Sequence, residues 1–267
     1  MPVANARMYS ATPQLRADWK ALLAWVLQQA GLPWEVIDHD PPAPLNALWA
    51  RDDLGLAMMC GLPYAQRAIR PLLVAAPIPS PARYGGRPVY FTDIVVRSDA
   101  AFTRLEDTFG GTVGYTLADS MSGGVALRDH LAPYRSARGE RLYARAVGNL
   151  IHARGVIEAL VRGEIDVGPL DSYYHDLLRQ DDPAFAAQVR TIASTQARPI
   201  PPLVATAPLR DAQLQALRSA LQASIAAPAL AEVRQRLLLA GFAEPEAASY
   251  DSLPAIAAQP MPAFEAL

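Results

Sequence analysis

The sequence predicts an α/β fold with parallel, doubly wound sheets, and two observations support this prediction. Strand-like and helix-like segments alternate along most of the 267 residues, as they do in successive βαβ units. Hydrophobic residues make up 51% of the chain and charged residues 19%, which supplies a sizeable core and argues against disorder. A chain of this length is compatible with one large domain or with two smaller ones.

The first third of the chain sets up this alternation. Pro13 begins a helix whose apolar side chains recur at helical spacing, and Gly31 ends it. A second, short helix is expected at residues 44–50. The strands expected around these helices cover residues 4–9, 34–38, 54–59, 69–75 and 89–96. The last of these strands is long and apolar, and we expect it to cross between two lobes.

The same alternation continues to residue 206, and the chain then becomes helical. Helices are expected at residues 101–107, 125–131, 153–162 and 173–178, and a helical pair interrupted by Pro228 at residues 211–240. Strands are expected at residues 112–116, 143–147, 166–170, 189–193 and 203–206. Residues 134–140 are polar and are interpreted as a loop, and the tail from Glu244 is rich in alanine and proline.

Composition excludes several classes of function. The net charge is -2, so no basic surface indicates a nucleic acid or an anionic membrane as partner. Cys60 is the only cysteine, which rules out an intrachain disulfide and a thiolate zinc cluster. The four histidines show no metal-ligand spacing, so no metal is expected. No cofactor is expected either, since no cofactor-binding motif such as a Walker loop is present.

Membrane and targeting signals are sparse. No apolar run reaches the length of a membrane span, so no transmembrane segment is expected in this chain. The N-terminal residues lead directly into the first strand, with no visible signal peptide. We therefore expect a periplasmic protein if a signal peptide has been removed, and a cytoplasmic one otherwise.

The richest motif lies at residues 119–124, Asp-Ser-Met-Ser-Gly-Gly, between an expected strand and an expected helix. The first turn of a helix leaves N–H groups without partners and carries partial positive charge. The hydroxyls of Ser120 and Ser122 add donors, and the two glycines allow close approach to the backbone. These features predict an oxyanion cradle that needs no lysine. The alternative is that one of the serines is simply a helix cap.

Several motifs in order resemble the phosphonate-type substrate-binding proteins of ABC transporters. They are Met8-Tyr9, Cys60-Gly61-Leu62-Pro63, Tyr90, residues 104–107 (similar to the family's sLeDL helix), residues 119–123 (similar to its D-x-S-x-SG element) and residues 161–167 (similar to its G-x-x-D-V/A strand entry), followed by Asp171. The resemblance runs from the first strand to about Pro201. It implies the type II periplasmic binding protein fold, in which two lobes, each a mostly parallel sheet flanked by helices, enclose a ligand cleft. Lobe one is then expected at residues 1–92 plus 197–267, and lobe two at residues 93–196.

The same resemblance, together with the rule that open α/β sheets bind ligands beyond the carboxyl ends of their strands, suggests ligand-binding residues. They are Tyr9, Gly61, Tyr64, Tyr90, Ser120, Met121, Ser122, Gly123, His152 and Asp171. For Tyr9 and Tyr90 a core position at a strand end is the alternative. Met121 stands where relatives often carry a small polar residue, which marks a departure from the phosphonate pattern.

Other positions keep two interpretations each. His152 misses the family's ligand-facing histidine position by one residue, so it either reaches the cleft or faces solvent at a helix start. Arg154 is an alternative partner for an anion. Asp171 either accepts a hydrogen bond from the ligand or caps its helix. His175 and Asp176 are expected at the surface.

The leading functional hypothesis is a non-catalytic solute-binding protein that delivers a small anionic or zwitterionic ligand to the membrane permease of an ABC importer. No catalytic motif such as GxSxG or a Walker loop is present, so no enzyme is expected. One alternative is a cytoplasmic ligand sensor. Another is a pyrimidine-precursor-synthase-like enzyme on the same fold, which would need a lysine for pyridoxal phosphate. Lys20 is the only lysine.

Overall fold

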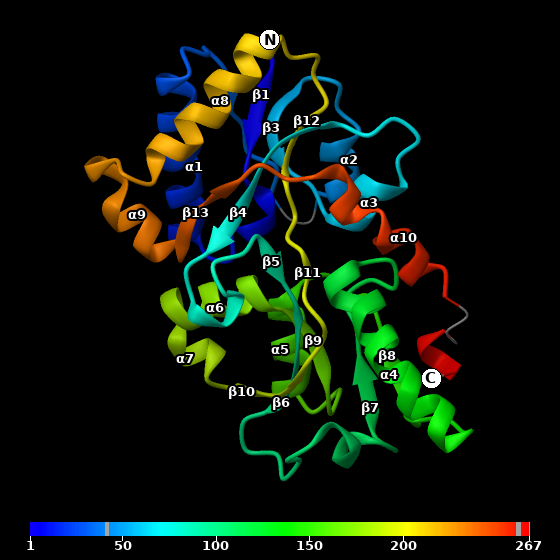
Figure 1. Cartoon of the computed structure of the whole chain (residues 1–267). Helices are drawn as coiled ribbons and strands as arrows, with labels where there is room; N and C mark the ends of the chain where they lie inside the picture. The colour runs from blue at the N-terminus through cyan, green and yellow to red at the C-terminus, as the bar shows by residue number, and fades with distance from the viewer. Residues whose placement is uncertain (41–42, 260–262, 267) are drawn as a thin grey trace. The chain divides into compact units, whose positions relative to one another are not determined.

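The computed structural model describes residues 1–40, 43–259 and 263–266. The chain divides into two compact units, which are described separately (Figure 1). Unit 1 comprises residues 1–89 and 199–251, and unit 2 comprises residues 90–198 and 252–267. The residues after 251 therefore go with unit 2 in this division, whereas the sequence assigned everything from residue 197 onward to the first lobe. The described part of the chain contains no helix that is long and apolar enough to cross a membrane.

Unit 1 is built on a six-stranded sheet with the order β13-β4-β12-β3-β1-β2. Its strands are β1 (Val3–Asn5), β2 (Glu35–Val36), β3 (Leu54–Met58), β4 (Leu72–Pro79), β12 (Leu203–Ala205) and β13 (Leu239–Ala243). β1 pairs in parallel with β2 and β3. β12 enters antiparallel between β3 and β4, and β13 adds antiparallel to β4.

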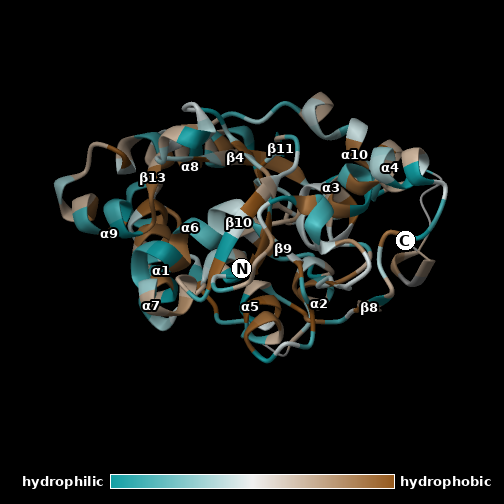
Figure 2. Ribbon diagram, turned by 90° about the horizontal axis from the view of Figure 1, so that it is seen from below, coloured by the Kyte–Doolittle hydropathy of each residue, from teal (hydrophilic) through white to brown (hydrophobic). Residues whose placement is uncertain are grey.

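Helices cover both faces of this sheet. α1 (Pro13–Gln29), α8 (Asp211–Ser224) and α9 (Ala231–Arg236) lie together on one face, and α2 (Leu45–Trp49) and α3 (Gly61–Gln66) lie on the other (Figure 1). The Thr12 hydroxyl accepts a hydrogen bond from Leu15 N at 3.2 Å and caps α1 ahead of Pro13. In Figure 2 the hydrophobic colour marks β13 and the hydrophilic colour marks α9, in which no residue is buried.

Two contacts in unit 1 explain why Gly55 and Asp18 occupy their positions. A Cβ atom on Gly55 would lie 2.3 Å from the Trp34 ring, so only glycine at this position of β3 leaves room for the indole. The Arg236 guanidinium of α9 donates to both carboxylate oxygens of Asp18 on α1, at 2.8 and 2.7 Å. Asp18 is almost fully buried, and this bidentate pair therefore satisfies a carboxylate that water does not reach.

Unit 2 contains two small sheets. The first has the order β10-β6-β9, formed by β10 (Val189–Ser194), β6 (Thr92–Arg97) and β9 (Gly168–Asp171). The second pairs β7 (Thr112–Gly114) in parallel with β8 (Arg145–Val147). A parallel bridge from Val113 to Val167 links β7 to the segment entering β9. The carboxyl ends of β7, β8 and β9 consequently face the same edge of this unit.

The helices of unit 2 are α4 (Ala126–Arg138), α5 (Ala153–Val161), α6 (Ser172–Asp181), α7 (Pro183–Ala186) and α10 (Ser252–Ala257). α4, α5 and α6 all pack against β6. Residues 134–138, expected as a loop, continue α4 through Pro133 until Gly139 ends it at φ 69°. A short two-stranded ribbon of β5 (Val89–Tyr90) and β11 (Arg198–Pro199) lies where the chain passes between the units.

The α/β, two-unit architecture that the sequence predicted is confirmed, and its sheets are mixed in direction. The parallel pairs join strands connected through helices, as expected for βαβ units. The antiparallel pairs involve strands that return from the other unit or, like β13, from a helix on the same face.

The motif Arg104-Leu105-Glu106-Asp107 forms a single 3₁₀ turn, Leu105–Thr108, in place of the expected helix at residues 101–107. The backbone N–H groups of Thr103 and Arg104 and the Thr103 hydroxyl donate to one oxygen of Asp107, at 2.7, 2.9 and 2.9 Å. Hydrogen bonds from Arg104 and Thr103 lower the pKa of Asp107 to about 2. This carboxylate therefore stabilises the fold above its unfolded pKa of about 4, and that contribution is lost as the pH falls toward 2.

We therefore expect Asp107→Asn to lower the melting temperature at pH 6, with the difference from wild type shrinking steadily between pH 4 and pH 2. Thermal unfolding followed by circular dichroism measures this profile. Glu106→Gln is the matched control, since its carboxylate makes no hydrogen bond among the described residues. A constant difference across the whole pH range would contradict the prediction.

Candidate functional site

The serine- and glycine-rich motif forms one turn of π-helix, Met121–Val125, directly before α4. The N–H groups of Gly124 and Val125 both donate to the Ser120 carbonyl at 2.9 Å, and Gly123 N donates to the Ser120 hydroxyl oxygen at 3.3 Å. Ser120 thus caps the turn. The N–H groups of Met121 and Ser122 and the Ser122 hydroxyl find no acceptor or donor in the described part of the chain. Single π-turns at a helix start are frequent at functional sites.

Both glycines of the turn are required by close contacts, which are with backbone at Gly124 and with a side chain at Gly123. A Cβ on Gly124 would lie 2.4 Å from the Leu117 carbonyl oxygen, and one on Gly123 would lie 1.7 Å from the Thr116 hydroxyl. Thr116 N in turn donates to the Gly123 carbonyl at 3.0 Å. The Met121 side chain is buried, so this residue offers only its N–H at the surface of the turn.

The start of β6 holds this turn beside the Asp171 turn. The Thr92 hydroxyl donates to the Ser122 carbonyl at 2.9 Å, and Thr92 stands opposite Asp171 in the β6–β9 register. The Asp171 carboxylate accepts from Tyr173 N and Tyr174 N at 3.0 and 3.1 Å and so caps α6. Tyr90 lies buried at the end of β5, two residues before Thr92. The structure therefore brings Tyr90, the serine turn and Asp171 into one neighbourhood of unit 2.

His152 is the N-cap residue of α5. Its Nδ1 accepts a hydrogen bond from Gly155 N at 3.1 Å, so the neutral ring carries its proton on Nε2. The preceding loop is tightly bent: Ile151 has φ 66°, and His152 N donates to the Leu150 carbonyl at 2.7 Å. A β-branched residue in this conformation is a genuine outlier and stores strain. This loop leaves β8 at the same edge as the serine turn.

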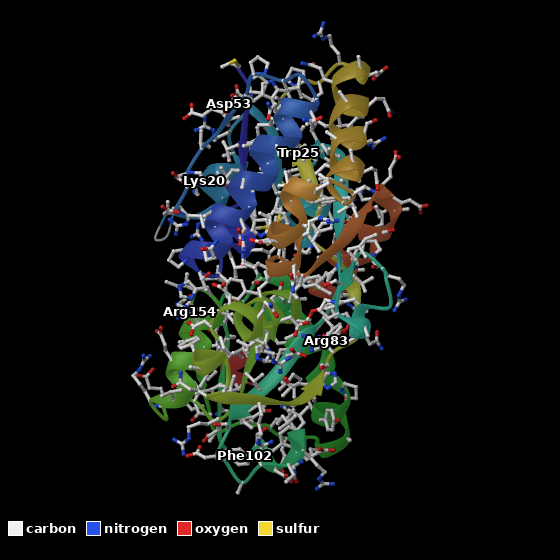
Figure 3. The ribbon with its side chains drawn as sticks, turned by 90° about the vertical axis from the view of Figure 1, so that its left-hand side faces the viewer. Lys20, Trp25, Asp53, Arg83, Phe102 and Arg154 are labelled. Atoms are coloured by element: carbon white, nitrogen blue, oxygen red, sulfur yellow. The ribbon has the colours of Figure 1, made fainter. Side chains whose placement is uncertain are left out.

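Two expectations about charged residues need correction. Arg154, on α5, was considered as an anion partner, but its guanidinium pairs with Asp182 at 3.1 Å and stacks over Phe185 at 4.0 Å (Figure 3).

His175 and Asp176 were expected at the surface, and both are buried. His175 Nδ1 lies 2.9 Å from Asp93 Oδ2 on β6, and the Ser194 hydroxyl donates to Asp93 Oδ1 at 2.9 Å. His175 Nε2 has no partner among the described residues. The sequence does not predict this cluster of Asp93, His175 and Ser194, because its members are far apart along the chain.

Three expected ligand-binding residues belong to unit 1. Tyr9 ends a 3₁₀ turn, Arg7–Tyr9, where the sequence predicted a continuous strand, and its side chain is buried. Gly61 begins α3 after Cys60. Tyr64 packs edge-on against Tyr250 with ring centroids 5.2 Å apart, and burial raises the pKa of its hydroxyl. That these residues line the same cleft as the serine turn stays a prediction.

Lys20, on which the pyridoxal phosphate alternative depends, lies on α1 (Figure 3). Its ammonium group pairs with Asp38 at 3.0 Å, and both side chains are exposed. Among the described residues, no group of three or more histidine, cysteine, aspartate or glutamate side chains is arranged to hold a metal ion.

A sequence profile described as "ABC transporter, phosphonate, periplasmic substrate-binding protein" matches residues 9–250. No curated protein matches the chain significantly.

Solved structures share the fold at low sequence identity. The binding protein component of an ABC phosphonate transporter from Pseudomonas aeruginosa has a TM-score of 0.76 at 18% identity, over 96% of this chain and 85% of that one. PhnD1 from Prochlorococcus marinus, in complex with methylphosphonate, also has a TM-score of 0.76, at 14% identity over 95% and 96% of the two chains. XAC2383 from Xanthomonas citri, bound to ATP, has a TM-score of 0.62 at 21% identity over 96% and 95%.

The profile match covers most of the chain and includes the serine turn, Tyr90 and Asp171. The chain belongs to the family of periplasmic, phosphonate-type substrate-binding proteins of ABC transporters.

Proposed function

We propose that this protein captures a small oxyanion, a phosphonate or a related phosphate-like or zwitterionic solute, and delivers it to the permease of an ABC importer. The turn at residues 120–123 provides the anion-binding groups. We place the protein in the periplasm, where its family works. Its role is binding and release, without chemical change of the ligand.

One observation carries this proposal. The π-turn before α4 presents two backbone N–H groups, of Met121 and Ser122, and the Ser122 hydroxyl, none of which has a partner in the described part of the chain. Partial positive charge at the start of a helix adds to these donors. Three donors on one short turn match the several acceptor oxygens of a phosphonate or phosphate group.

Asp171 and Tyr90 complete the proposed site in unit 2. The Asp171 carboxylate caps α6 and lies opposite Thr92, whose hydroxyl binds the serine turn. Its negative charge would attract the amino group of a zwitterionic ligand, which is why we include zwitterions in the ligand class.

A thermal-shift panel tests the ligand class. We expect methylphosphonate, 2-aminoethylphosphonate, phosphate, phosphite or an alkylsulfonate to raise the melting temperature by several degrees. At a concentration a hundred times its Kd, a ligand adds about 2.7 kcal/mol to the free energy of unfolding. Flat melting curves for all of these anions, with a shift from a neutral sugar or amino acid, would overturn the oxyanion proposal.

Variants of the turn locate the site. We expect Ser122→Ala to raise the Kd of the ligand that gives the largest shift by about tenfold, since a hydrogen bond to a charged group contributes about 1.5–3 kcal/mol. Isothermal titration calorimetry measures this change. Ser136→Ala, on the exposed far end of the same helix, is the matched control. Equal affinities for the two variants would place the ligand elsewhere.

A further inference from the structure

The C-terminal segment reaches the core of unit 2. α10 packs against the π-turn, and the Phe264 side chain is 2% exposed within the apolar cluster that contains Val113, Leu127 and Leu131. The segment that follows β13, the last strand of the unit 1 sheet, thus supplies a core residue to unit 2, which contains the serine turn.

Phe264 meets this unit through Tyr115, the first residue after β7. The two rings stack in parallel, with centroids 4.0 Å apart and planes 6° apart. The backbone of Tyr115 holds the loop after β8, because its carbonyl accepts from Leu150 N and its N–H donates to the Val147 carbonyl. The Tyr115 ring also leaves no room for a Cβ on Gly148, where the nearest ring atom would lie 2.2 Å away.

A second path runs through Arg128 on α4. Its guanidinium lies over the Phe264 ring, 5.6 Å from the centroid, and donates to the Ala118 carbonyl at 3.3 Å. Ala118 lies two residues before Ser120, and its carbonyl oxygen would lie 3.0 Å from a Cβ atom on Gly124. Phe264 therefore contacts Tyr115, which binds the loop after β8, and Arg128, which binds the segment before the serine turn.

The loop after β8 needs such support. Ile151 holds φ 66° although its side chain is 62% exposed, so its own packing does not impose this conformation. Strained backbone persists only where the surroundings over-determine it, and the Leu150–Tyr115 hydrogen bond is one of the constraints.

We propose that Phe264 is a positioning residue. The described C-terminal residues, 252–259 and 263–266, hold the serine turn and the loop of residues 148–152 in their binding geometry, with Phe264 acting through Tyr115 and Arg128. The relevance of this role to ligand affinity rests on the proposed function, whereas the positioning itself is a property of the ligand-free protein.

Hydrogen exchange of the full-length, ligand-free protein tests the positioning directly. We expect Phe264→Ala to speed amide exchange about tenfold or more at residues 116–124 and 148–152, with no change in unit 1. Phe264→Tyr keeps the stacked ring and should restore slow exchange. The matched control is Phe102→Ala, which removes a partly buried phenyl ring that packs against the same apolar cluster and follows the carboxyl end of β6 (Figure 3).

Titration with methylphosphonate and with phosphate supplies the second readout. We expect Phe264→Ala to raise the Kd of the binding anion about tenfold at a temperature where it and Phe102→Ala are both fully folded, with Phe102→Ala unchanged. Unaltered exchange at both loops in Phe264→Ala, or equal acceleration in Phe102→Ala, would overturn the positioning role. Accelerated exchange in a protein whose wild type binds neither anion would instead count against the proposed function alone.

Discussion

Asp93→Ala is expected to lower the free energy of unfolding by about 3–5 kcal/mol, as when one partner of a buried ion pair is removed. Asp93 and His175 are both completely buried, and the carboxylate accepts from His175 and from the Ser194 hydroxyl. Its loss leaves the buried His175 ring without that acceptor in the core that joins β6, α6 and β10, whereas the exposed Ser194 hydroxyl can turn to water. Urea unfolding followed by circular dichroism measures the change.

The paired substitution separates the cost of an orphaned polar group from the cost of lost volume. Asp93→Val combined with His175→Leu removes both polar partners, and we expect it to recover most of the loss, since hydrophobic replacements of buried pairs are often neutral. Asp93→Asn keeps the shape and one acceptor, and should cost less than Asp93→Ala. A double variant as unstable as Asp93→Ala would show that packing, and not the polar pair, carries the stability.

Gly124→Ala is expected to abolish oxyanion binding and to destabilise the protein by about 2 kcal/mol, because the new methyl group overlaps backbone. The carbonyl oxygens of Leu117 and Ala118 would lie only 2.4 and 3.0 Å from its Cβ, and backbone cannot move aside as a flexible side chain does. The π-turn must then open, and the N–H groups of Met121 and Ser122 lose their common direction. Calorimetric titration and thermal unfolding together measure both effects.

Gly241→Ala is the matched control for this substitution. Its Cβ would meet only the Ile78 side chain at 3.5 Å, an ordinary contact on β13. We expect unchanged binding and a melting temperature within a few degrees of wild type. Retained binding in Gly124→Ala would contradict the assignment of the ligand to this turn.

The alternating pattern predicted most of the fold, and the misses have local physical causes. The strand β13 was not predicted, and it begins at Leu239, inside the stretch that was expected to be helical up to residue 240. The chain turns out of α9 at Leu238, which adopts φ 48° where a glycine or asparagine is usual, so the sequence carries no break signal at this point. The extension of α4 was missed because Pro133 and polar residues normally indicate a loop, and only Gly139 marks the true end.

In the candidate site, too, features set by neighbouring residues in the sequence could be predicted, whereas contacts between distant residues could not. The turn at residues 119–124 was predictable because strand, hydroxyl residues, glycines and helix follow one another directly. The cap made by His152 and the pairing of Arg154 with Asp182 depend on which residues the folded structure brings together. The burial of His175 depends on Asp93, which lies in another strand, and a lone histidine in a polar helical segment gives no sign of such a partner.

Two elements that complete the protein's cores, β13 and Phe264, lie near the C-terminal end of this sequence, which affects when the protein can fold during its synthesis. β13 completes the sheet of unit 1 with residues 239–243, and Phe264 enters the core of unit 2 later still. The sheet of unit 1 is therefore incomplete until residue 243 has left the ribosome, and the core of unit 2 is incomplete until residue 264 has, although domains generally fold in order from the N-terminus. A nascent chain that has emerged only to residue 238 consequently lacks a core element in both units.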